Sequence, residues 1–375
     1  MPTYPSLYIP HPSRVLLNLL RSGRARTLEG ASFEPILNGY GLELQGNPTG
    51  VRQGNRSQTV ILPTSGGKKV LRTYKPSLSA STIELEHAVL EHLADRNFSS
   101  PRLTKAPSGN TLLRLGELRH VLFDFIPGGR HYYHYMLLPS QERRCIRACG
   151  ELLGELHAQL DDFSGGGYNP DGFTAFDQGR ERDIDWLLAK IPSCVEATRR
   201  DRLHEKNRDI AALLAATPEL EDQVRALHDA IDCAKLPRRI VHADFGPFNI
   251  LFWKEQPPVV LDFEMVRRDW RLVDLVRSFY RFCCAGSGFD LRAMTCLLGG
   301  YESRVDLTRE ESANIPNVWR FLAARDQILN WETFCRSRTA KSRKALRAAT
   351  FQWDWVGTHD SALRERFGWR QAVPA

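Results

Sequence analysis

The first part of the chain alternates short apolar runs with polar turns. Strands are predicted for GLELQ (41–45), SQTVILP (57–63) and KKVLRTY (68–74), which alternate apolar and polar residues or are rich in β-branched ones. The glycine-rich stretch GNPTGVRQGN (46–55) and the turn TSGG (64–67) separate these strands. Strands joined in series by short connections favour an antiparallel sheet.

Beyond this sheet the apolar residues take a helical spacing. We predict a helix for STIELEHAVLEHLAD (81–95), a strand ending at a Pro-Gly break for HVLFDFIPGG (120–129), and an amphipathic helix for QERRCIRACGELLGELHAQL (141–160). Helical patterns dominate the remainder of the chain. The order of elements predicts an α+β fold of two lobes, a small antiparallel β lobe followed by a larger, mainly helical lobe.

The hinge between the lobes is expected near residues 124–128. Residues 1–38 carry no motif and are treated as an N-terminal extension of unknown role. The small lobe then spans residues 39–126, and the larger lobe spans residues 127–375.

The composition allows a sizeable core. The chain has 375 residues, of which 42% are hydrophobic, enough for one or two domains. It has no apolar run of about 18 residues that would predict a membrane span. The apolar patch in RVLLNLLRSGR (14–24) is too short for a secretory signal. The eight cysteines include no CxxC pair, which argues against a zinc site or a disulfide framework. We expect a reduced cytoplasmic protein.

The formal charge of +7 is spread along the chain except for one basic run, RSRTAKSRKALR (336–347). Such a run typically forms a solvated helix face, and an anion-facing patch is the alternative. Nucleic-acid binding favours aromatic residues interleaved with the charges, and this run has none. We therefore predict no nucleic-acid partner, and we infer no obligate protein partner.

A polar loop between two apolar runs carries the candidate chemistry. In RRIVHADFGPFNILFW (238–253), the runs RIV and ILFW predict strands, and the residues between them include His242, Asp244 and Asn249. Gly246 and Pro247 mark a tight loop. An ordinary hairpin loop, or a buried histidine bonded to backbone, are the two simpler interpretations.

A further carboxylate, Asp262, follows thirteen residues after Asn249 at the end of the strand VVL. Mg²⁺ prefers hard oxygen ligands and usually takes only one or two carboxylates besides phosphate oxygens and water. Asp262 and the carbonyl of Asn249 can supply such oxygens, which leaves Asp244 to accept the proton of a hydroxyl. This set suits phosphoryl transfer, in which the protein mainly positions groups and compensates phosphate charge.

The sequence here resembles the aminoglycoside phosphotransferase and choline kinase-like family of small-molecule kinases, which have a protein-kinase-like fold. The resemblance rests on VHADFGPFNILF (241–252), VVLDFE (259–264) and WRLVDLVRSF (270–279). Further segments that resemble the family's elements are GVRQGNRSQTVILPTSGGKKVLRTYKP (50–76), ELEHAVLEHL (84–93), VLFDFIPGG (121–129) and LLGELHAQL (152–160). The resemblance covers about residues 40–335 and implies an ATP- and Mg²⁺-dependent kinase acting on a small-molecule hydroxyl.

Carried over to this chain, the resemblance implies Asp244 as the catalytic base and Asn249 and Asp262 as Mg²⁺ ligands. His242 and Asp274 would brace the loop. The small lobe would bind the nucleotide, and the larger lobe would carry the catalytic and acceptor sites.

On the nucleotide side, the resemblance implies that Glu86 anchors a phosphate-binding basic residue on the third strand. The other residues implied to bind the nucleotide are Gly54, Asn55, Ser57, Asp124 and Ile126. The family usually has Lys where this chain has Arg72. We expect Arg72 to face the phosphates because Val70, Arg72 and Tyr74 share one strand face, whereas Lys75 lies on the other. Lys75 as a substitute, and Arg72 as the cap of an exposed strand, are the alternatives.

A second departure lies in the loop DFGPFN, where many family members have His and Gly in place of Gly246 and Phe248. We expect activity to survive this change and Phe248 to reshape the acceptor pocket. Two other functions are considered. A protein kinase is disfavoured because no Ala-Pro-Glu signature follows Asp262, and a catalytically silent nucleotide-binding scaffold has only Arg72 in its support. The family resemblance leaves the acceptor open among aminoglycosides, amino alcohols, sugars and similar alcohols.

Overall fold

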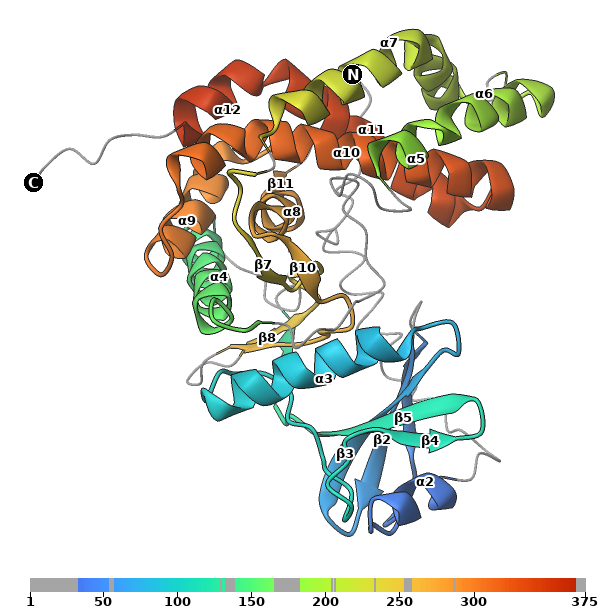
Figure 1. Cartoon of the computed structure of the whole chain (residues 1–375), viewed down its shortest axis with the longest axis vertical. Helices are drawn as coiled ribbons and strands as arrows, with labels where there is room; N and C mark the ends of the chain where they lie inside the picture. The colour runs from blue at the N-terminus through green and yellow to red at the C-terminus, as the bar shows by residue number, and fades with distance from the viewer. Residues whose placement is uncertain are drawn as a thin grey trace, which may run out of the picture.

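The computed structural model describes residues 33–53, 57–128, 130–131, 139–164, 183–203, 205, 207–232, 234–252, 258–285 and 288–368. Within these ranges the chain forms a small lobe built on an antiparallel sheet and a larger helical lobe, with the strand β8 near their junction (Figure 1). The predicted α+β, two-lobed fold is therefore confirmed. The Gly54 and Asn55 positions expected over the nucleotide lie outside the described residues.

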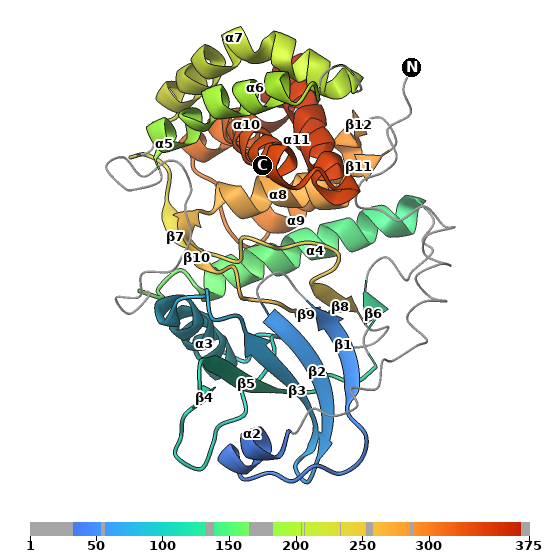
Figure 2. The ribbon, with the colours of Figure 1, turned by 90° about the vertical axis from the view of Figure 1, so that its right-hand side faces the viewer.

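The small lobe is a five-stranded antiparallel sheet in the order β1-β2-β3-β5-β4. Its strands are β1 (Thr49–Gln53), β2 (Ser57–Thr64), β3 (Gly67–Tyr74), β4 (Leu113–Leu115) and β5 (Leu118–Asp124). The helix α3 (Ala80–Asp95) covers one face, and the short helix α2 (Glu34–Gly39) lies at the far end of the sheet (Figure 2).

Strand alternation sorts the side chains of this sheet between two cores. On β5, Val121 and Phe123 join the main core, which includes residues of α3, whereas Leu122 joins a smaller core formed with α2. On β3, Leu71 packs in the α2 core and Tyr74 in the main core. Because successive side chains point to opposite faces, this arrangement sends Arg72 toward α3.

The first predicted strand is wrong in position. GLELQ makes only an isolated bridge, from Leu44 to Thr64, and β1 instead forms within the segment that was predicted to be a loop. Gly46 has a φ of +115°, which departs from extended backbone and ends the earlier strand pattern. The helix α2 also begins inside the stretch assigned to the N-terminal extension, and its packing joins residues 33–39 to the sheet.

The larger lobe consists mainly of helices that share the main core. They are α4 (Pro139–Gln159), α5 (Ile184–Leu188), α6 (Lys190–Arg200), α7 (Arg208–Ala230), α8 (Leu272–Phe282), α9 (Leu291–Glu302), α10 (Arg309–Ser337), α11 (Ala340–Thr358) and α12 (Asp360–Phe367). Among the helices in the described ranges, none combines the length and the apolar character needed to cross a bilayer.

Short strands hold the loops that face the small lobe. The strand β7 (Arg238–Val241) pairs with β10 (Arg267–Trp270), and β8 (Ile250–Phe252) pairs with β6 (Arg130–His131) and β9 (Val259–Val260). A further small pair is formed by β11 (Cys284–Ala285) and β12 (Gly288–Phe289). Because β7 and β8 pair with different partners, the loop between them is not a hairpin loop.

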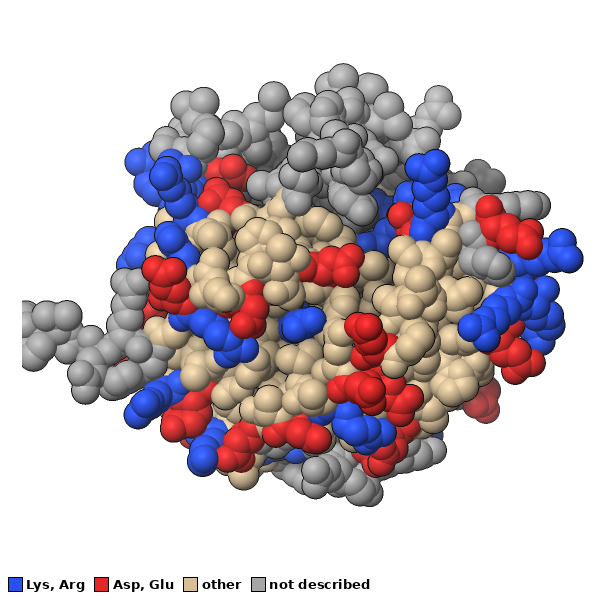
Figure 3. All heavy atoms as spheres, turned by 90° about the horizontal axis from the view of Figure 1, so that it is seen from above, with Lys and Arg blue, Asp and Glu red and all other residues tan. Residues whose placement is uncertain are grey.

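The basic run 336–347 does not form a single helix face. It crosses from α10 to α11 at Arg338, which ends α10 in a left-handed conformation with a φ of +50°. Arg338 pairs with Asp201 and Arg347 with Asp209, so part of the run fastens the helices to their neighbours. On the face of the helical lobe seen in Figure 3, acidic and basic side chains alternate around the margin.

Candidate active site

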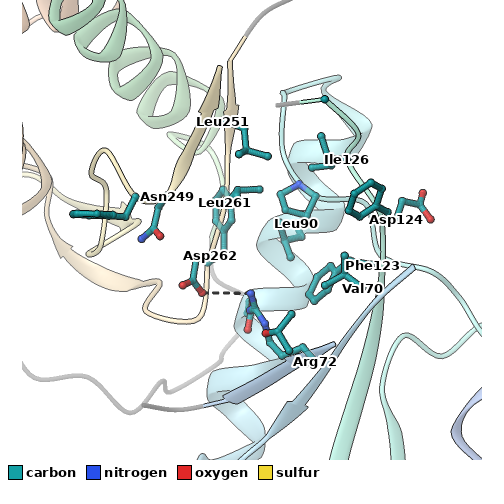
Figure 4. A pocket seen from close by; sticks show the side chains of 17 residues that line it. Val70, Arg72, Leu90, Phe123, Asp124, Ile126, Asn249, Leu251, Leu261 and Asp262 are labelled. Atoms are coloured by element: carbon teal, nitrogen blue, oxygen red, sulfur yellow. Dashed lines mark hydrogen bonds and ion pairs between the residues drawn. The ribbon is translucent and has the colours of Figure 1, made fainter. Parts of the chain in front are cut away.

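A cavity of about 390 Å³ lies between the two lobes. Its apolar lining comes from both lobes and includes Val70, Leu90, Phe123, Ile126, Leu251 and Leu261. Charged and polar side chains occupy one end, where Arg72 and Glu86 of the small lobe meet Asn249 and Asp262 of the larger lobe (Figure 4). A pocket with an apolar body and a few convergent polar groups is typical of a small-ligand site.

Arg72 stands at the centre of the charged end. Its Nη1 lies 2.7 Å from Glu86 Oε1, so the expected ion pair is present, and its Nη2 lies 3.4 Å from Asp262 Oδ1. The guanidinium also stacks over the Phe123 ring, 5.1 Å from its centroid. Burial acts against the charge, but Glu86 and then Asp262 outweigh it, and the pKa of Arg72 is raised.

Glu86 is almost fully buried and accepts a second hydrogen bond, of 2.9 Å, from the Tyr74 hydroxyl. Burial raises the pKa of Glu86 to about 7, while Arg72 and Tyr74 oppose that shift. Since both neighbours donate to Glu86, the pair is strongest when the carboxylate is ionised. Lys75, by contrast, is exposed and lies beyond the end of β3.

The loop after β7 is held from behind by Asp274 of α8. One carboxylate oxygen of Asp274 accepts from His242 N and the other from Ala243 N, each at 2.7 Å. His157 of α4 lies 3.2 Å from the same carboxylate. Burial opposes ionisation of Asp274, but the His157 contact and the neighbouring donors keep its pKa below the ordinary value.

His242 joins this loop to the strand that carries Asp262. Its Nε2 lies 2.9 Å from Leu261 O, and its Nδ1 accepts from Asp244 N at 3.2 Å. These contacts match a neutral imidazole protonated on Nε2. His242 and Asp274 thus have the contacts that loop-bracing residues require, and the interpretation of His242 as a buried, backbone-bonded histidine holds as well.

Asp244 faces both Asn249 and a basic residue that the sequence analysis did not single out. Asn249 Nδ2 donates to Asp244 Oδ2 at 2.7 Å and to Asp244 O at 2.9 Å, and Arg281 of α8 forms an ion pair with Asp244 Oδ1. Burial opposes ionisation of Asp244, but the charge of Arg281, together with the hydrogen bonds from Arg281 and Asn249, holds its pKa below the ordinary value.

The Asn249 and Asp262 side chains line the same cavity. Leu261 N donates to Asn249 O at 2.7 Å, which ties the residue before Asp262 to Asn249. The Asn249 amide nitrogen donates to Asp244, which leaves the amide oxygen as the atom that could act as a ligand. An amide oxygen and one carboxylate, with room beside them, fit Mg²⁺, which keeps most of its other ligands from phosphate and water.

Two residues of these loops have left-handed backbone conformations, Ala243 with a φ of +62° and Asp262 with a φ of +64°. Such conformations cost a non-glycine residue roughly 1–2 kcal/mol. The hydrogen bonds of Asp274 to the backbone at Ala243, and of His242 to the carbonyl before Asp262, hold both turns in place. Strained backbone of this kind concentrates at functional sites.

The other predicted residues are distributed as follows. Ile126 lines the cavity, whereas the Asp124 carboxylate points away from it in Figure 4 and pairs with Lys69 at 2.6 Å. Any contact of Asp124 with a ligand in the cavity therefore involves its backbone. Ser57 is buried and donates to Glu264 Oε2 at 2.9 Å, so it bridges the lobes instead of pointing freely into the cavity.

The residues missed by the sequence analysis are Glu264 and two arginines of α8, Arg277 and Arg281. Arg277 Nη1 donates to Ala243 O at 3.1 Å, and Arg281 Nη1 donates to Phe245 O at 3.0 Å. A signal was present, because Asp274, Arg277 and Arg281 are spaced three and four residues apart. That spacing places them on one face of a largely apolar helix directly after the motif.

The chain is similar to known proteins over most of its length. A model of the phosphotransferase enzyme family matches residues 48–287. The homoserine kinase of Zymomonas mobilis subsp. mobilis is 24% identical over 321 residues, covering 84% of this chain and 83% of the relative. The homoserine kinase of Methylocella silvestris is 26% identical over 289 residues, covering 75% of this chain and 80% of the relative.

Solved structures share the fold at lower identity. An aminoglycoside phosphotransferase from Alicyclobacillus acidocaldarius superposes with a TM-score of 0.64 at 16% identity, covering 91% of this chain and 98% of that one. An amicoumacin kinase in complex with AMP-PNP and Ca²⁺ superposes with a TM-score of 0.59 at 14% identity, covering 93% and 94%. Because the family match spans more than half of the sequence, the chain belongs to the phosphotransferase enzyme family, the small-molecule kinases that its motifs resemble.

Proposed function

We propose that this protein transfers the γ-phosphoryl group of ATP to a hydroxyl group of a small molecule in a Mg²⁺-dependent reaction. The observation that carries the proposal is the cavity between the lobes, where Arg72 and Glu86 meet Asn249 and Asp262 at the end of an apolar slot. An apolar slot suits a purine base, and the charged end suits its phosphates. The hinge residues Asp124 and Ile126 border the slot.

In this proposal Arg72 binds phosphate oxygens and Glu86 keeps the guanidinium in place. Asn249 and Asp262 hold Mg²⁺, which when bound compensates the charge of the phosphates. Asp262, which now lies 3.4 Å from Arg72 Nη2, would be the carboxylate ligand of that cation. Gly54 and Asn55 are proposed to bind the phosphates, and the neighbouring Ser57 donates to Glu264 of the larger lobe.

Asp244 is proposed as the base. The acceptor oxygen forms a bond to the γ-phosphorus while the bond from that phosphorus to the bridging oxygen of ADP breaks, and Asp244 takes the hydroxyl proton. Asn249 fixes the direction of the carboxylate through its two hydrogen bonds. The lowered pKa keeps Asp244 ionised at neutral pH, so its role is mainly to orient the hydroxyl and to receive the proton late.

Homoserine is the first acceptor to test, because the relatives named above are homoserine kinases. The match with this chain covers 83% and 80% of their lengths. At this level of identity the acceptor is not inherited from the relatives, and the site is therefore tested with a panel that also contains amino alcohols, sugars and an aminoglycoside.

The decisive experiment measures ADP release with Mg-ATP and the panel, using the wild-type protein and Asp244→Asn. We expect acceptor-dependent ADP release in the wild type and a fall in kcat of about 10² or more in the variant, with unchanged nucleotide binding. A variant that keeps more than a tenth of the wild-type kcat would remove Asp244 from the base role. Binding of ATP without turnover by any acceptor would favour a silent scaffold.

A further inference from the structure

Arg281 occupies the place beside Asp244 that an acceptor must reach. Its guanidinium contacts both the Asp244 carboxylate and the Phe245 carbonyl, and its side chain is 17% exposed. Gly246 makes this position possible, because a Cβ at Gly246 would stand 2.7 Å from Arg281 Cδ. Gly246 is one of the loop residues that depart from the usual family pattern, so this chain combines an unusual glycine with an arginine at the catalytic loop.

Arginine side chains gather beside Asp244. Arg277, Arg281 and Arg325 face two carboxylates, Asp244 and Asp326. Arg277 Nη2 lies 3.8 Å from Asp326 Oδ1, and Arg325 Nη2 lies 2.7 Å from the same oxygen. Arg277 and Arg281 also donate to the backbone carbonyls of Ala243 and Phe245, so two guanidinium groups lie directly against this loop.

The arginines also have hydrogen-bond donors to spare. A guanidinium has five N–H groups, and in the part of the chain that the structure describes, Arg281 uses two of them, for Asp244 and Phe245. The Nε of Arg277 is buried and has no hydrogen-bond partner among the described residues. A planar guanidinium with free donors matches the geometry of a carboxylate, which it can bind through two parallel hydrogen bonds.

These observations fit an acceptor that carries a negatively charged group in the same molecule as its hydroxyl. A hydroxyl bound to Asp244 competes with Arg281 for the same carboxylate, unless the acceptor offers Arg281 another partner a few bonds away. We propose that Arg281 binds a carboxylate of the acceptor, so that the substrates are hydroxy acids, including hydroxy amino acids, and not polycationic antibiotics. This inference rests on the proposed phosphoryl transfer and names the class of its acceptor.

The acceptor's carboxylate would take over the Arg281 guanidinium and leave Asp244 free to accept the hydroxyl proton. A polycation would instead meet Arg277 and Arg281 at the catalytic loop, where like charges cost binding energy. The carboxylate itself is unchanged by the reaction, and the phosphoryl group goes to the hydroxyl oxygen. Arg281 is thus a specificity-determining residue that also positions Asp244.

The test compares matched acceptors with and without the carboxylate. The pairs are homoserine with the amino alcohol that remains when its carboxylate is removed, and glycerate with glycerol; an aminoglycoside is included as the polycation. For each pair, the ratio of kcat/KM is measured for the wild type, Arg281→Gln, Arg281→Lys and the control Arg292→Gln, an exposed arginine on α9. The ratio cancels effects of the substitutions on nucleotide binding and on Asp244.

We expect the wild type and the control to favour a carboxylate acceptor by about tenfold or more, and Arg281→Gln to bring that ratio close to one. Arg281→Lys should restore part of the preference, because it keeps the charge but loses the planar fork. A ratio that stays the same in Arg281→Gln overturns the inference, as does a neutral or cationic best acceptor. An equal rise of kcat for all acceptors in Arg281→Gln would show that Arg281 only restrains Asp244.

If no acceptor of the panel is phosphorylated, the inference is tested by measuring acceptor binding. Calorimetric titration of the hydroxy acids into the protein with AMP-PNP and Mg²⁺ should show binding that Arg281→Gln weakens, and absence of binding overturns the inference. Failure of the proposed kinase function looks different, because it would appear as absent Mg-ATP binding, or as acceptor turnover that Asp244→Asn leaves intact.

Discussion

At the scale of single residues, the site depends on a few charges that are buried in pairs. Arg72 and Glu86 are the clearest case, since the side chain of Glu86 is 1% exposed and that of Arg72 is 14% exposed. Removing one partner of such a pair leaves the other charge without compensation, which typically costs about 3–5 kcal/mol. The neighbouring Lys75, three residues along the chain, is exposed and serves as a matched comparison.

Substituting these two basic residues tests which of them binds the phosphates. Arg72→Ala should raise KM for ATP and lower kcat, with a loss of about tenfold or more in kcat/KM, because charge-assisted hydrogen bonds to phosphate are lost. Lys75→Ala should change both constants less than about twofold, since Lys75 is exposed and lies beyond the end of β3. Circular dichroism establishes that both variants are folded. The opposite order of effects would mean that Lys75 is the phosphate ligand.

His87 gives the small lobe a dependence on pH. Its ring is buried beside Tyr74 and Thr111, with Nδ1 2.7 Å from Thr111 Oγ1. Burial, followed by the charge of Arg72, lowers the pKa of His87 to about 4 from the model-compound value of 6.5. The unfolded chain therefore binds a proton between pH 6.5 and 4 that the folded protein does not, so the stabilising contribution is present above pH 6.5 and is lost as the pH falls toward 4.

This contribution amounts to at most roughly 3 kcal/mol. Glu86, whose pKa is raised, acts in the opposite direction between pH 4.5 and about 7, and it does so in the wild type and in a His87→Gln variant alike. Urea unfolding from pH 7 to 4.5 should therefore show stability falling more steeply with decreasing pH in the wild type than in His87→Gln. Parallel curves for the two proteins would contradict this prediction.

At the scale of elements, α8 supplies most of the support for the catalytic loop. The Asp274 carboxylate accepts hydrogen bonds from the backbone N–H groups of His242 and Ala243 at the start of this loop. Arg277 and Arg281 donate to backbone carbonyl groups of the same loop. Behind this helix, α4 brings His157 to Asp274. The position of α4 is set in turn by its close packing with α9, in which glycines allow the two backbones to approach.

Adjacent glycines of α9 give a sharp test of that packing. A Cβ at Gly300 would lie 2.1 Å from Arg147 O of α4, whereas a Cβ at Gly299 would lie 3.2 Å from the end of the Arg147 side chain, which can move. Gly300→Ala should force the helices apart and destabilise the protein by about 1–3 kcal/mol or more. Gly299→Ala should be neutral or stabilise it by up to about 1 kcal/mol, through helix propensity alone.

Thermal unfolding of both variants distinguishes these outcomes. The two substitutions are chemically identical and one residue apart, so a difference in Tm reports the contact with α4 and not the loss of glycine. Equal Tm values would mean that the two helices are not packed as closely as their backbones indicate.

At the scale of the whole molecule, polar contacts join the two lobes beside the cavity. Two of them lie at the charged end of the cavity. One is the ion pair of Arg72 with Asp262, and the other is the hydrogen bond from Ser57 to Glu264. A ligand that occupies the cavity adds contacts to both lobes and therefore stabilises the folded chain, by about 2.7 kcal/mol at a concentration of 100 Kd. In the proposed function, the Mg²⁺-dependent part of that stabilisation would depend on Asp262.

Asp262→Ala should lose the Mg²⁺ dependence of ATP affinity. In the wild type we expect ATP to raise Tm more with Mg²⁺ than with a chelator, and in the variant we expect the two shifts to be equal. Binding without Mg²⁺ should be retained or strengthened in the variant, because Arg72 no longer shares its charge with Asp262. A variant with the wild-type metal dependence would show that Asp262 serves only the fold.

Much of this protein was determined by its sequence alone. Periods of two and of about 3.6 residues separate the sheet from the helices, and these local patterns depend only on where apolar side chains fall along the chain. The same alternation predicted that Arg72 and not Lys75 faces Glu86, because neighbouring residues of a strand must point to opposite faces. Asp244, Asn249 and Asp262 could be proposed as site residues because the loops that carry them follow directly from strands.

Strand pairing, helix packing and contacts between distant residues could be seen only in the tertiary structure. The pairing of β7 with β10 instead of β8, and the packing of α2 on the sheet, depend on partners distant in sequence. The left-handed backbone at Ala243 and Asp262 is held by residues of other elements against its intrinsic cost. Arg281 meets Asp244 across 37 residues of chain. Its contact forms only because α8 packs against the loop and Gly246 leaves the space, and it is from that contact that we infer the class of the acceptor.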